Sequence, residues 1–526
     1  MQRLLAVLIA ATGLLLSACA SERKSEIAQS EWEKVIALRG EARDFLRELQ
    51  KNEFNSRTGA GPDERADIFA RYQNLFSEAN IELLQRVEDS FEPGPDERKF
   101  RRLRLFLIES RIRAALLPER QYLEEMLSGY RFNLNDRTYS LPQASRVLAE
   151  SPDRTLREQL YENLLPLLQR ENAVRRRVLE LTDSALYHFG YGSILSFVEE
   201  KLDVDYAALA TQAQEFLTAS DSLFRALAED LVPQLAGIKL NNLRGYDIAY
   251  LMNADPLGAL FHPDSLPPIV ARTLRAWHLP PDTLILIQIV VDSSDFGGRS
   301  STYAIAPPSD LRIIVTCPRG SAHFHEYYHE LGHALGYLYS QERELELAQL
   351  GSVAVSEASA FALEDLLLEP RYLTETLTMA PAAARRYVRL AAFQRLLLLR
   401  RLCADVLFEQ VLFSEAENIQ AEYEQSHRQL FGFEWSAVDR EMYLRGIGEE
   451  TAAEYLQGLG LAAALQNFAT ENLGDDYFRQ PDYGNLLKEF WSFGRRLSAS
   501  QLSVQLDLGS LDPNTTLKHL RRLTQP

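Results

Sequence analysis

The sequence predicts a mainly α-helical protein with one small β-sheet. From about residue 25 to 280, and again from about 320 to the end, apolar residues recur every three or four positions, which is the period of an amphipathic helix. Between these regions, the runs Thr283–Val291 and Leu311–Cys317 are dense in β-branched residues, which favour strands. We therefore expect a small sheet immediately before the helix that carries the histidine-rich stretch described below.

Length and composition limit the possible classes of protein. A chain of 526 residues can bury a large core, as two domains or one large one. The net charge of −18 and the absence of a long basic run argue against nucleic-acid binding. Cys317 and Cys403 are too few for a disulfide framework, so the fold depends on its core. We predict a boundary near residue 145, which separates an N-terminal helical region, 19–145, from a second domain, 146–526.

The N-terminus has the pattern of a targeting segment. Arg3 supplies a positive charge, and the apolar run Leu4–Ala18 is too short to span a membrane comfortably, so residues 1–18 are predicted to be a signal peptide. The end of this run, Leu16-Ser17-Ala18-Cys19, resembles the lipobox of bacterial lipoproteins, in which the chain is cut before an acylated cysteine. That resemblance implies export and a lipid anchor at Cys19, and Ala20 after it favours the outer membrane, facing the periplasm. A plain secretory signal is the alternative, and it also exports the protein.

The stretch HEYYHELGH, residues 325–333, contains two overlapping HExxH motifs that share His329. On a helix this motif places two histidines one turn apart on one face, where both can bind one Zn²⁺ at about 2.0–2.1 Å. The glutamate between them then faces the metal-bound water as a general base. The motif alone is also compatible with a helix face of histidines and ion-paired glutamates.

A catalytic zinc site requires a third protein ligand. A histidine six residues after the second one is excluded, because Leu335 and Tyr339 occupy those positions. Glu357 on the next predicted helix lies 24 residues after His333, which is far enough for a turn and a second helix crossing the metal. Glu364 follows two turns later on nearly the same face, where it can accept the free ring N–H of a ligating histidine.

The second copy of the motif is the better candidate for the metal site. Gly332 within it allows another backbone to approach closely, whereas the first copy has two tyrosines at the corresponding places. The sequences YHELGHALG and SEASAFALEDL resemble the active-site helices of the thimet oligopeptidase and oligoendopeptidase F family of gluzincins. In this resemblance His329, His333 and Glu357 match the zinc ligands, and Glu330 matches the general base.

The resemblance covers about residues 150–500 and carries expectations about fold and function. It implies a two-lobed helical zincin with a small sheet beside the active-site helix, one Zn²⁺ per chain, and hydrolysis of short peptides. DFGGRSSTYAIAPPSDLRIIV is similar to the family's Gly/Arg-rich strand pair, whose edge strand can hold a peptide by main-chain hydrogen bonds.

A late helix in this family carries a histidine and tyrosines that stabilise the oxyanion. By resemblance, Tyr455 matches the last tyrosine, and Tyr443 stands where the histidine would be. The other tyrosines of the pattern are replaced by Ala or Gly here. His427 could supply the missing histidine, although a surface position is favoured for it. His325, one turn before the first ligand, is expected to line a cleft wall or to be solvated.

Two alternative functions remain at this stage. A dipeptidyl carboxypeptidase resembling angiotensin-converting enzyme shares the 24-residue gap between the second histidine and the glutamate. A catalytically inactive peptide-binding envelope lipoprotein would use the fold as a scaffold, but such a protein has no need of Glu330.

Overall fold

The computed structural model describes residues 27–292, 299–316, 319–414, 418–445 and 451–524. Within these residues the protein is mainly α-helical with two small sheets, which confirms the predicted fold class. The predicted signal peptide, Cys19 and Cys317 lie outside the described residues. None of the described helices is long and apolar enough to span a membrane.

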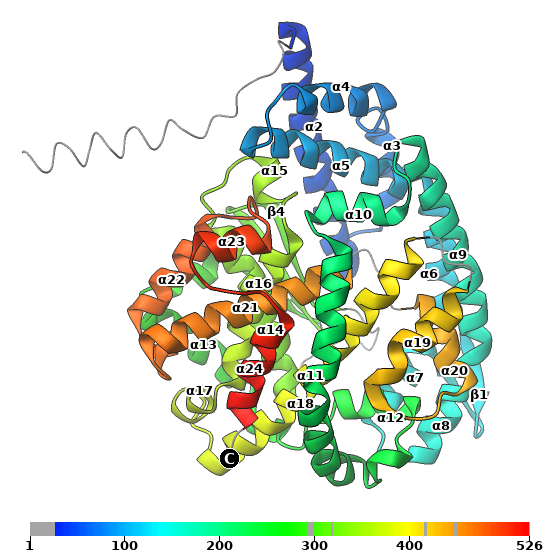
Figure 1. Ribbon diagram of the computed structural model, residues 1–526, viewed down its shortest axis with the longest axis vertical. Helices are drawn as coiled ribbons and strands as arrows, with labels where there is room; N and C mark the ends of the chain where they lie inside the picture. Colours follow the sequence, from blue (N-terminus) through cyan, green and yellow to red (C-terminus); the bar gives the residue numbers. More distant parts are fainter. Residues whose placement is uncertain (1–26, 293–298, 317–318, 415–417, 446–450, 525–526) are drawn as a thin grey trace, which may run out of the picture. The chain divides into compact units, whose positions relative to one another are not determined.

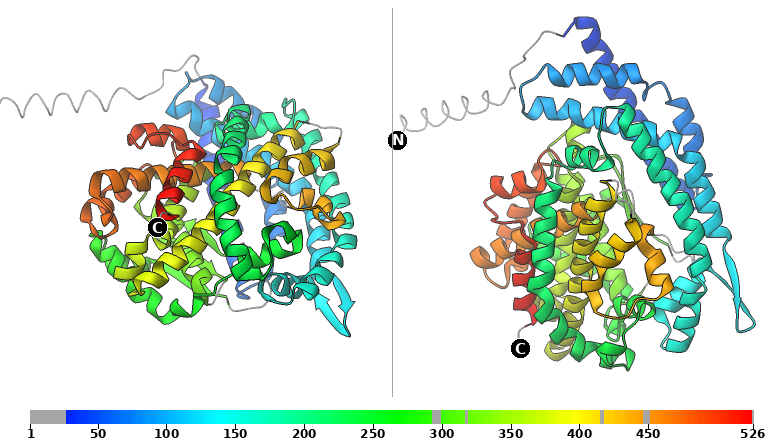
Figure 2. Two further views of the ribbon diagram at one scale, coloured as in Figure 1. Left: turned by 60° about the horizontal axis from the view of Figure 1, so that its bottom comes forward. Right: turned by 45° about the vertical axis from the view of Figure 1, so that its right-hand side comes forward.

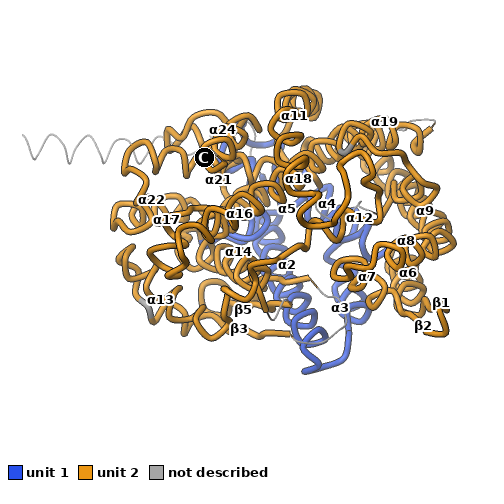
Figure 3. The backbone as a smooth tube through the Cα atoms, turned by 90° about the horizontal axis from the view of Figure 1, so that it is seen from below, with its two compact units in different colours: residues 1–115, 343–351 blue, residues 116–342, 352–526 orange. Residues whose placement is uncertain are grey.

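The chain divides into two compact units, which Figure 3 colours separately. Unit 1 comprises residues 1–115 and 343–351, and unit 2 comprises residues 116–342 and 352–526. This division differs from the boundary predicted near residue 145. The sequence also contains no sign that a short segment from the middle of the chain belongs with the N-terminal helices.

Unit 1 is built from helices. Its elements are α2 (Gln29–Arg57), α3 (Arg65–Arg71), α4 (Glu78–Asp89), α5 (Pro95–Ala115) and α15 (Leu345–Ala348). Aromatic rings form part of its core, where Phe45 packs edge-on against Phe69 and Phe76. An ion pair holds the segment 343–351 in this unit. The fully buried carboxylate of Glu346 accepts hydrogen bonds from Arg39 Nε at 2.5 Å and Nη2 at 2.9 Å. A buried carboxylate is stable only with such partners.

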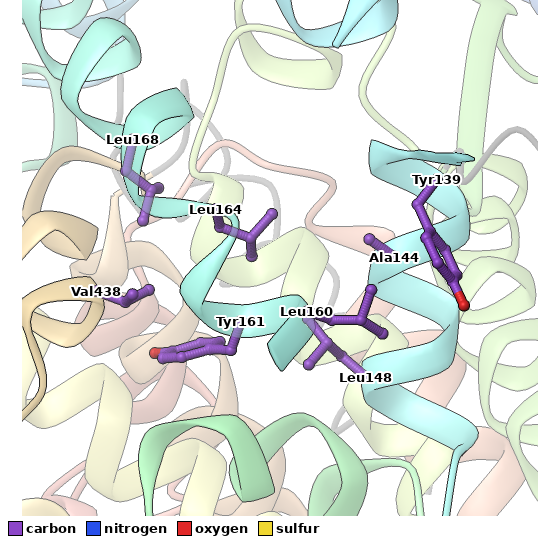
Figure 4. Close-up of a cluster of buried hydrophobic side chains, with 8 residues drawn as sticks. All are labelled: Tyr139, Ala144, Leu148, Leu160, Tyr161, Leu164, Leu168 and Val438. Atoms are coloured by element: carbon purple, nitrogen blue, oxygen red, sulfur yellow. The ribbon is translucent and has the colours of Figure 1, made fainter. Parts of the chain in front are cut away.

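Unit 2 begins with a helix, which is followed by a β-hairpin and a group of helices. Its first elements are α6 (Leu117–Gly129), β1 (Arg131–Leu134), β2 (Arg137–Ser140), α7 (Leu141–Glu150), α8 (Arg154–Glu162), α9 (Leu165–His188), α10 (Ile194–Leu202), α11 (Tyr206–Ala236), α12 (Gly245–Met252) and α13 (Leu266–Ala276). Figure 4 shows a buried apolar cluster formed by Tyr139, Ala144, Leu148, Leu160, Tyr161, Leu164, Leu168 and Val438. Because residues from the hairpin to α9 share this cluster, they fold in unit 2, and no boundary falls at 145.

The central sheet lies where the sequence predicts one, with a third strand added. Its strands are β3 (Ile287–Val291), β4 (Ser301–Ala306) and β5 (Asp310–Val315), in the order β3-β5-β4. β3 is parallel to β5, and β4 is antiparallel to β5. The predicted strand 283–291 is shorter than expected, because its first residues form the 3₁₀ turn η4 (Pro281–Leu286). β4 is an edge strand, and both β4 and β5 pack on α14 (Gly320–Tyr339).

The remaining helices of unit 2 follow α16 (Val353–Glu364) in the chain. They include η5 (Asp365–Leu368), α17 (Pro370–Glu375), α18 (Pro381–Leu412), α19 (Ile419–Phe431), α20 (Ala437–Glu441), η6 (Met442–Leu444), α21 (Ala452–Leu473), η7 (Tyr477–Arg479), α22 (Pro481–Ser492), α23 (Ala499–Gln505) and α24 (Pro513–Thr524). The long helices of the unit include α9, which lies along one side of it, α11 and α18 (Figure 1 and Figure 2). α16 packs between α14 and α21 and is buried along most of its length, as its many small and apolar residues require.

Candidate metal centre

α14 presents His329 and His333 on one face, one turn apart. Their ring centroids lie 4.9 Å from each other. The helix begins at Gly320, whose φ of +70° suits glycine, and the carboxylate of Asp255 accepts a hydrogen bond from the backbone N–H of Ser321 at 2.8 Å. This acceptor satisfies a backbone N–H in the first turn, and its negative charge interacts favourably with the positive end of the helix dipole. The helix that carries the histidines therefore has a defined start.

Close helix packing brings Glu357 of α16 to the two histidines. A Cβ atom on Gly332 would lie 2.4 Å from the backbone oxygen of Ser359 and 2.6 Å from Cα of Ala360, so only glycine permits this crossing of α14 and α16. The close approach expected at Gly332 from the sequence is therefore present. On the opposite side of α16, a Cβ on Gly458 of α21 would lie 2.5 Å from Cβ of Glu357. α16 is thus packed against a glycine of α14 on one side and a glycine of α21 on the other, and Glu357 lies at the second contact.

The three side chains have the donor geometry of a zinc site. Nε2 of His329 and Nε2 of His333 each lie 3.5 Å from an oxygen of Glu357. Among the described residues, these three form the group whose ligand atoms all lie within 4.8 Å of one another. Zinc with tetrahedral ligands at about 2.0–2.2 Å requires donor atoms roughly 3.3–3.6 Å apart. The donor set and both histidine-to-glutamate separations therefore fit Zn²⁺.

The outer nitrogen of each imidazole is also engaged. Nδ1 of His329 lies 3.0 Å from Glu364 Oε2, and Nδ1 of His333 lies 2.9 Å from Ser356 Oγ. With Nδ1 bonded outward, Nε2 of each ring is directed toward Glu357. The structure places Glu364 where the sequence analysis expected an acceptor, whereas Ser356 was not anticipated, because a serine beside a glutamate carries no recognisable signal.

The surroundings shift the pKa values of the two histidines in opposite directions. Burial lowers the pKa of His329, but the hydrogen bond to Glu364 and the charges of Glu357 and Glu364 outweigh it and raise the pKa to about 10. Burial and the adjacent charge of His329 lower the pKa of His333 well below its usual value. A metal that binds here must therefore displace a proton from His329.

Glu330 follows the candidate ligand His329 in the chain and is nearly fully buried, with 5% of its surface exposed. Oγ1 of Thr302, on the edge strand β4, lies 2.7 Å from Glu330 Oε2 and 2.9 Å from the Glu330 backbone oxygen. The sheet thus holds this carboxylate in one orientation. Thr302 was missed in the sequence, because its role depends on a contact between a strand and a helix 28 residues away.

The candidate oxyanion residues have different surroundings. Tyr455 is half-buried on α21, one turn before Gly458, the residue that contacts Glu357. Tyr443 is buried on η6, its hydroxyl accepts a hydrogen bond from Arg176 of α9, and its ring lies 5.4 Å from the Arg176 guanidinium. The contacts of Tyr443 are thus with α9, and its role as an oxyanion donor stays a prediction, as does that of Tyr455.

Two further histidines have hydrogen-bond partners that the sequence did not indicate. His427 is buried rather than at the surface, and its Nε2 lies 2.9 Å from Asp405 Oδ1. His325 is partly exposed, and its Nδ1 lies 3.0 Å from Glu364 Oε1 and its Nε2 2.6 Å from the hydroxyl of Tyr387. The three partners, Asp405, Glu364 and Tyr387, come from other helices, which the spacing of the histidines could not indicate.

Comparison with known proteins identifies the fold. No family model matches the sequence, and no curated protein matches it. Among solved structures, a "putative oligoendopeptidase F" from Bacillus anthracis str. Ames superposes with a TM-score of 0.59 at 13% identity, over 87% of this chain and 82% of that chain. A second structure of the same description superposes with a TM-score of 0.63 at 14% identity, over 97% and 98% of the two chains. At this identity the likeness establishes a shared fold over nearly the whole chain.

Proposed function

We propose that the protein is a zinc metallopeptidase that hydrolyses peptide bonds of short peptides. The observation that carries this proposal is the complete set of two imidazoles, a carboxylate and an adjacent buried glutamate on α14 and α16. Three protein ligands leave one position for water or substrate, which is the arrangement of catalytic rather than structural zinc. The description of both neighbours as oligoendopeptidase F supports the same activity.

Bound zinc would supply Lewis acidity, which polarises a peptide carbonyl and makes water ionise near neutral pH. Glu330 accepts the proton of the attacking water and delivers it to the amine nitrogen of the leaving peptide. Thr302 keeps the Glu330 carboxylate aimed for this transfer, since its hydroxyl contacts both the side chain and the backbone of that residue. Glu364 and Ser356 keep the two imidazoles oriented.

Two other elements of unit 2 serve the substrate in this proposal. β4 is an edge strand beside α14, so an extended peptide can add to it by main-chain hydrogen bonds. Tyr455 donates a hydrogen bond to the oxyanion that forms on the scissile carbonyl. Tyr443 is the second candidate for this donor, and its contact with Arg176 makes Tyr455 the preferred one.

Metal content and substrate length test the proposal together. The purified protein should contain one zinc per chain, and a chelator should abolish cleavage of a short fluorogenic peptide that excess zinc then restores. Peptides blocked at the C-terminus should be cleaved as well as free ones. A strict requirement for a free C-terminus would favour a dipeptidyl carboxypeptidase, and zinc without any cleavage would favour an inactive binding protein.

We also propose that the protein is exported and anchored to the membrane through acylated Cys19. The support is the sequence Leu16-Ser17-Ala18-Cys19 after an apolar run. Cys19→Ser should release the protein from membranes or block its processing, because acylation requires the thiol. Fractionation of cells that express each form is the measurement, and a variant that stays processed and membrane-bound would exclude the lipoprotein assignment.

A further inference from the structure

His325 belongs to a hydrogen-bonded chain that ends at a proposed metal ligand. Its Nδ1 lies 3.0 Å from Glu364 Oε1, and its Nε2 lies 2.6 Å from the hydroxyl of Tyr387 on α18. An ionised carboxylate can only accept, so Nδ1 of His325 carries the proton, and the Tyr387 hydroxyl donates to Nε2. These two contacts define one tautomer and one ring orientation for His325.

The carboxylate of Glu364 divides its two oxygens between different partners. Oε1 faces His325 and also accepts from Arg395 Nη2 at 2.8 Å, while Oε2 faces Nδ1 of His329 at 3.0 Å. Arg395 does not hold Oε1 alone, because the same Nη2 also lies 2.7 Å from Asp365. His325 therefore contributes a hydrogen bond to Oε1 that is independent of this shared guanidinium.

We propose that His325 and Tyr387 are positioning residues for the metal ligand His329. They fix Glu364, whose terminal torsion is otherwise soft, so that Oε2 keeps the Nδ1 proton of His329 and its Nε2 is presented to the metal. This inference rests on the proposed zinc site. In this proposal the first HExxH copy also contributes to the site, because its first histidine, His325, orients the shared ligand His329 without binding the metal itself.

The expected effect is on metal affinity rather than on stoichiometry. His325→Ala should still bind one zinc at saturating metal, but about 10–100-fold more weakly, as is typical when the partner of a ligating histidine is disturbed. Tyr387→Phe should weaken binding in the same direction and by less. Dissociation constants are measured by competition with a chromogenic chelator, and the absorption spectrum of the cobalt-substituted protein reports the ligand geometry.

Conservative variants separate positioning from a general loss of stability. His325→Asn places an amide N–H near the position of Nδ1 and should recover most of the affinity, whereas His325→Gln places its amide nearer Nε2 and should not. His427→Asn is the control, because it removes a second histidine that is bonded to a carboxylate, Asp405. Its zinc affinity should equal that of the wild type. Thermal unfolding of each metal-free protein shows whether it is folded.

The outcomes distinguish this inference from the proposed function. If the wild type binds no zinc, the proposed function fails. If the wild type binds zinc and His325→Ala has the same dissociation constant, the positioning role is excluded while the zinc site stands. An equal loss in His427→Asn, or an Asn variant no better than Ala, also contradicts the positioning role. If His325→Ala does not fold, Tyr387→Phe and His325→Asn decide between these results.

Discussion

The two overlapping HExxH copies on α14 have the same spacing but different surroundings. In the first copy the two middle positions are Tyr327 and Tyr328, and the Tyr328 hydroxyl lies 2.6 Å from that of Tyr372. In the second copy they are Leu331 and Gly332, and α16 crosses directly against the glycine. The crossing brings Glu357 to the second copy, whereas the first copy meets Glu364 and the hydroxyls of Tyr372 and Tyr387.

The fold thus supplies a third candidate metal ligand to the second copy of the motif, which is why we assign the proposed zinc site to that copy. His333 has Glu357 at 3.5 Å, while His325 has Glu364 and Tyr387, both at hydrogen-bond distance. The acids of the two copies differ as well, since Glu330 is buried and held by Thr302, whereas Glu326 is half-buried. Matched substitutions in the two copies test this contrast.

The largest effect is expected from substituting the histidine that is specific to each copy, His333 or His325. His333→Ala should lose zinc on dialysis and with it all peptidase activity, because two protein ligands do not retain the ion against water. His325→Ala should keep one zinc per chain when the metal is in excess. Metal analysis of both variants is the measurement. Zinc retained without His333 and lost without His325 would reverse the assignment of the two copies.

The two glutamates should differ almost as much in turnover. Glu330→Gln should keep zinc and the fold but lower the rate by about 10²–10⁴, because an amide cannot accept the proton of water. Glu326→Gln should cleave at the wild-type rate. Steady-state kinetics on one peptide compare them, with zinc content as the control. Wild-type turnover in the Glu330 variant would move the general base elsewhere, and Glu326 would be examined first.

The two candidate oxyanion donors, Tyr455 on α21 and Tyr443 on η6, should also differ in their effects. Tyr455→Phe should lower the maximal rate by about 10²–10³, the usual cost of losing one oxyanion donor, with little change in zinc content or apparent substrate affinity. Tyr443→Phe should cost stability rather than rate, because its hydroxyl bonds Arg176. Rates that match the wild type in both variants would remove these tyrosines from the mechanism.

The smallest effect concerns the helix crossing itself. Gly332→Ala should destabilise the protein by about 1–3 kcal/mol, because its Cβ would meet the backbone of α16 and one side must shift. Alanine is the better helix former by about 1 kcal/mol, which offsets only part of this cost. Tyr328→Phe, at the matching position of the first copy, should cost about 1 kcal/mol for one hydrogen bond. Denaturant unfolding measures both, and an unchanged unfolding midpoint for Gly332→Ala would mean that α14 and α16 are less closely packed than these distances indicate.

Local patterns determined a large part of this protein. Helical and β-branched periodicity depends on neighbouring residues, so it predicted the mainly α fold and the sheet before α14. The spacing of His329, His333 and Glu357 placed the candidate ligands, because a helix turn and a short helix–turn–helix connection have nearly constant dimensions. The close approach at Gly332 followed from the absence of a side chain there.

Only the tertiary structure decided which distant residues complete the site. Thr302 reaches Glu330 from a strand, Tyr387 reaches His325 from α18, and Arg395 reaches Glu364 from the same helix. Tertiary packing likewise assigned residues 343–351 to unit 1 through Arg39 and Glu346. These contacts join residues far apart in the chain, and their formation depends on how whole helices and strands pack. No periodicity or spacing in the sequence encodes such a contact, so Thr302, Tyr387 and Arg395 could be found only in the folded molecule, whereas Glu364 was expected from its spacing to Glu357.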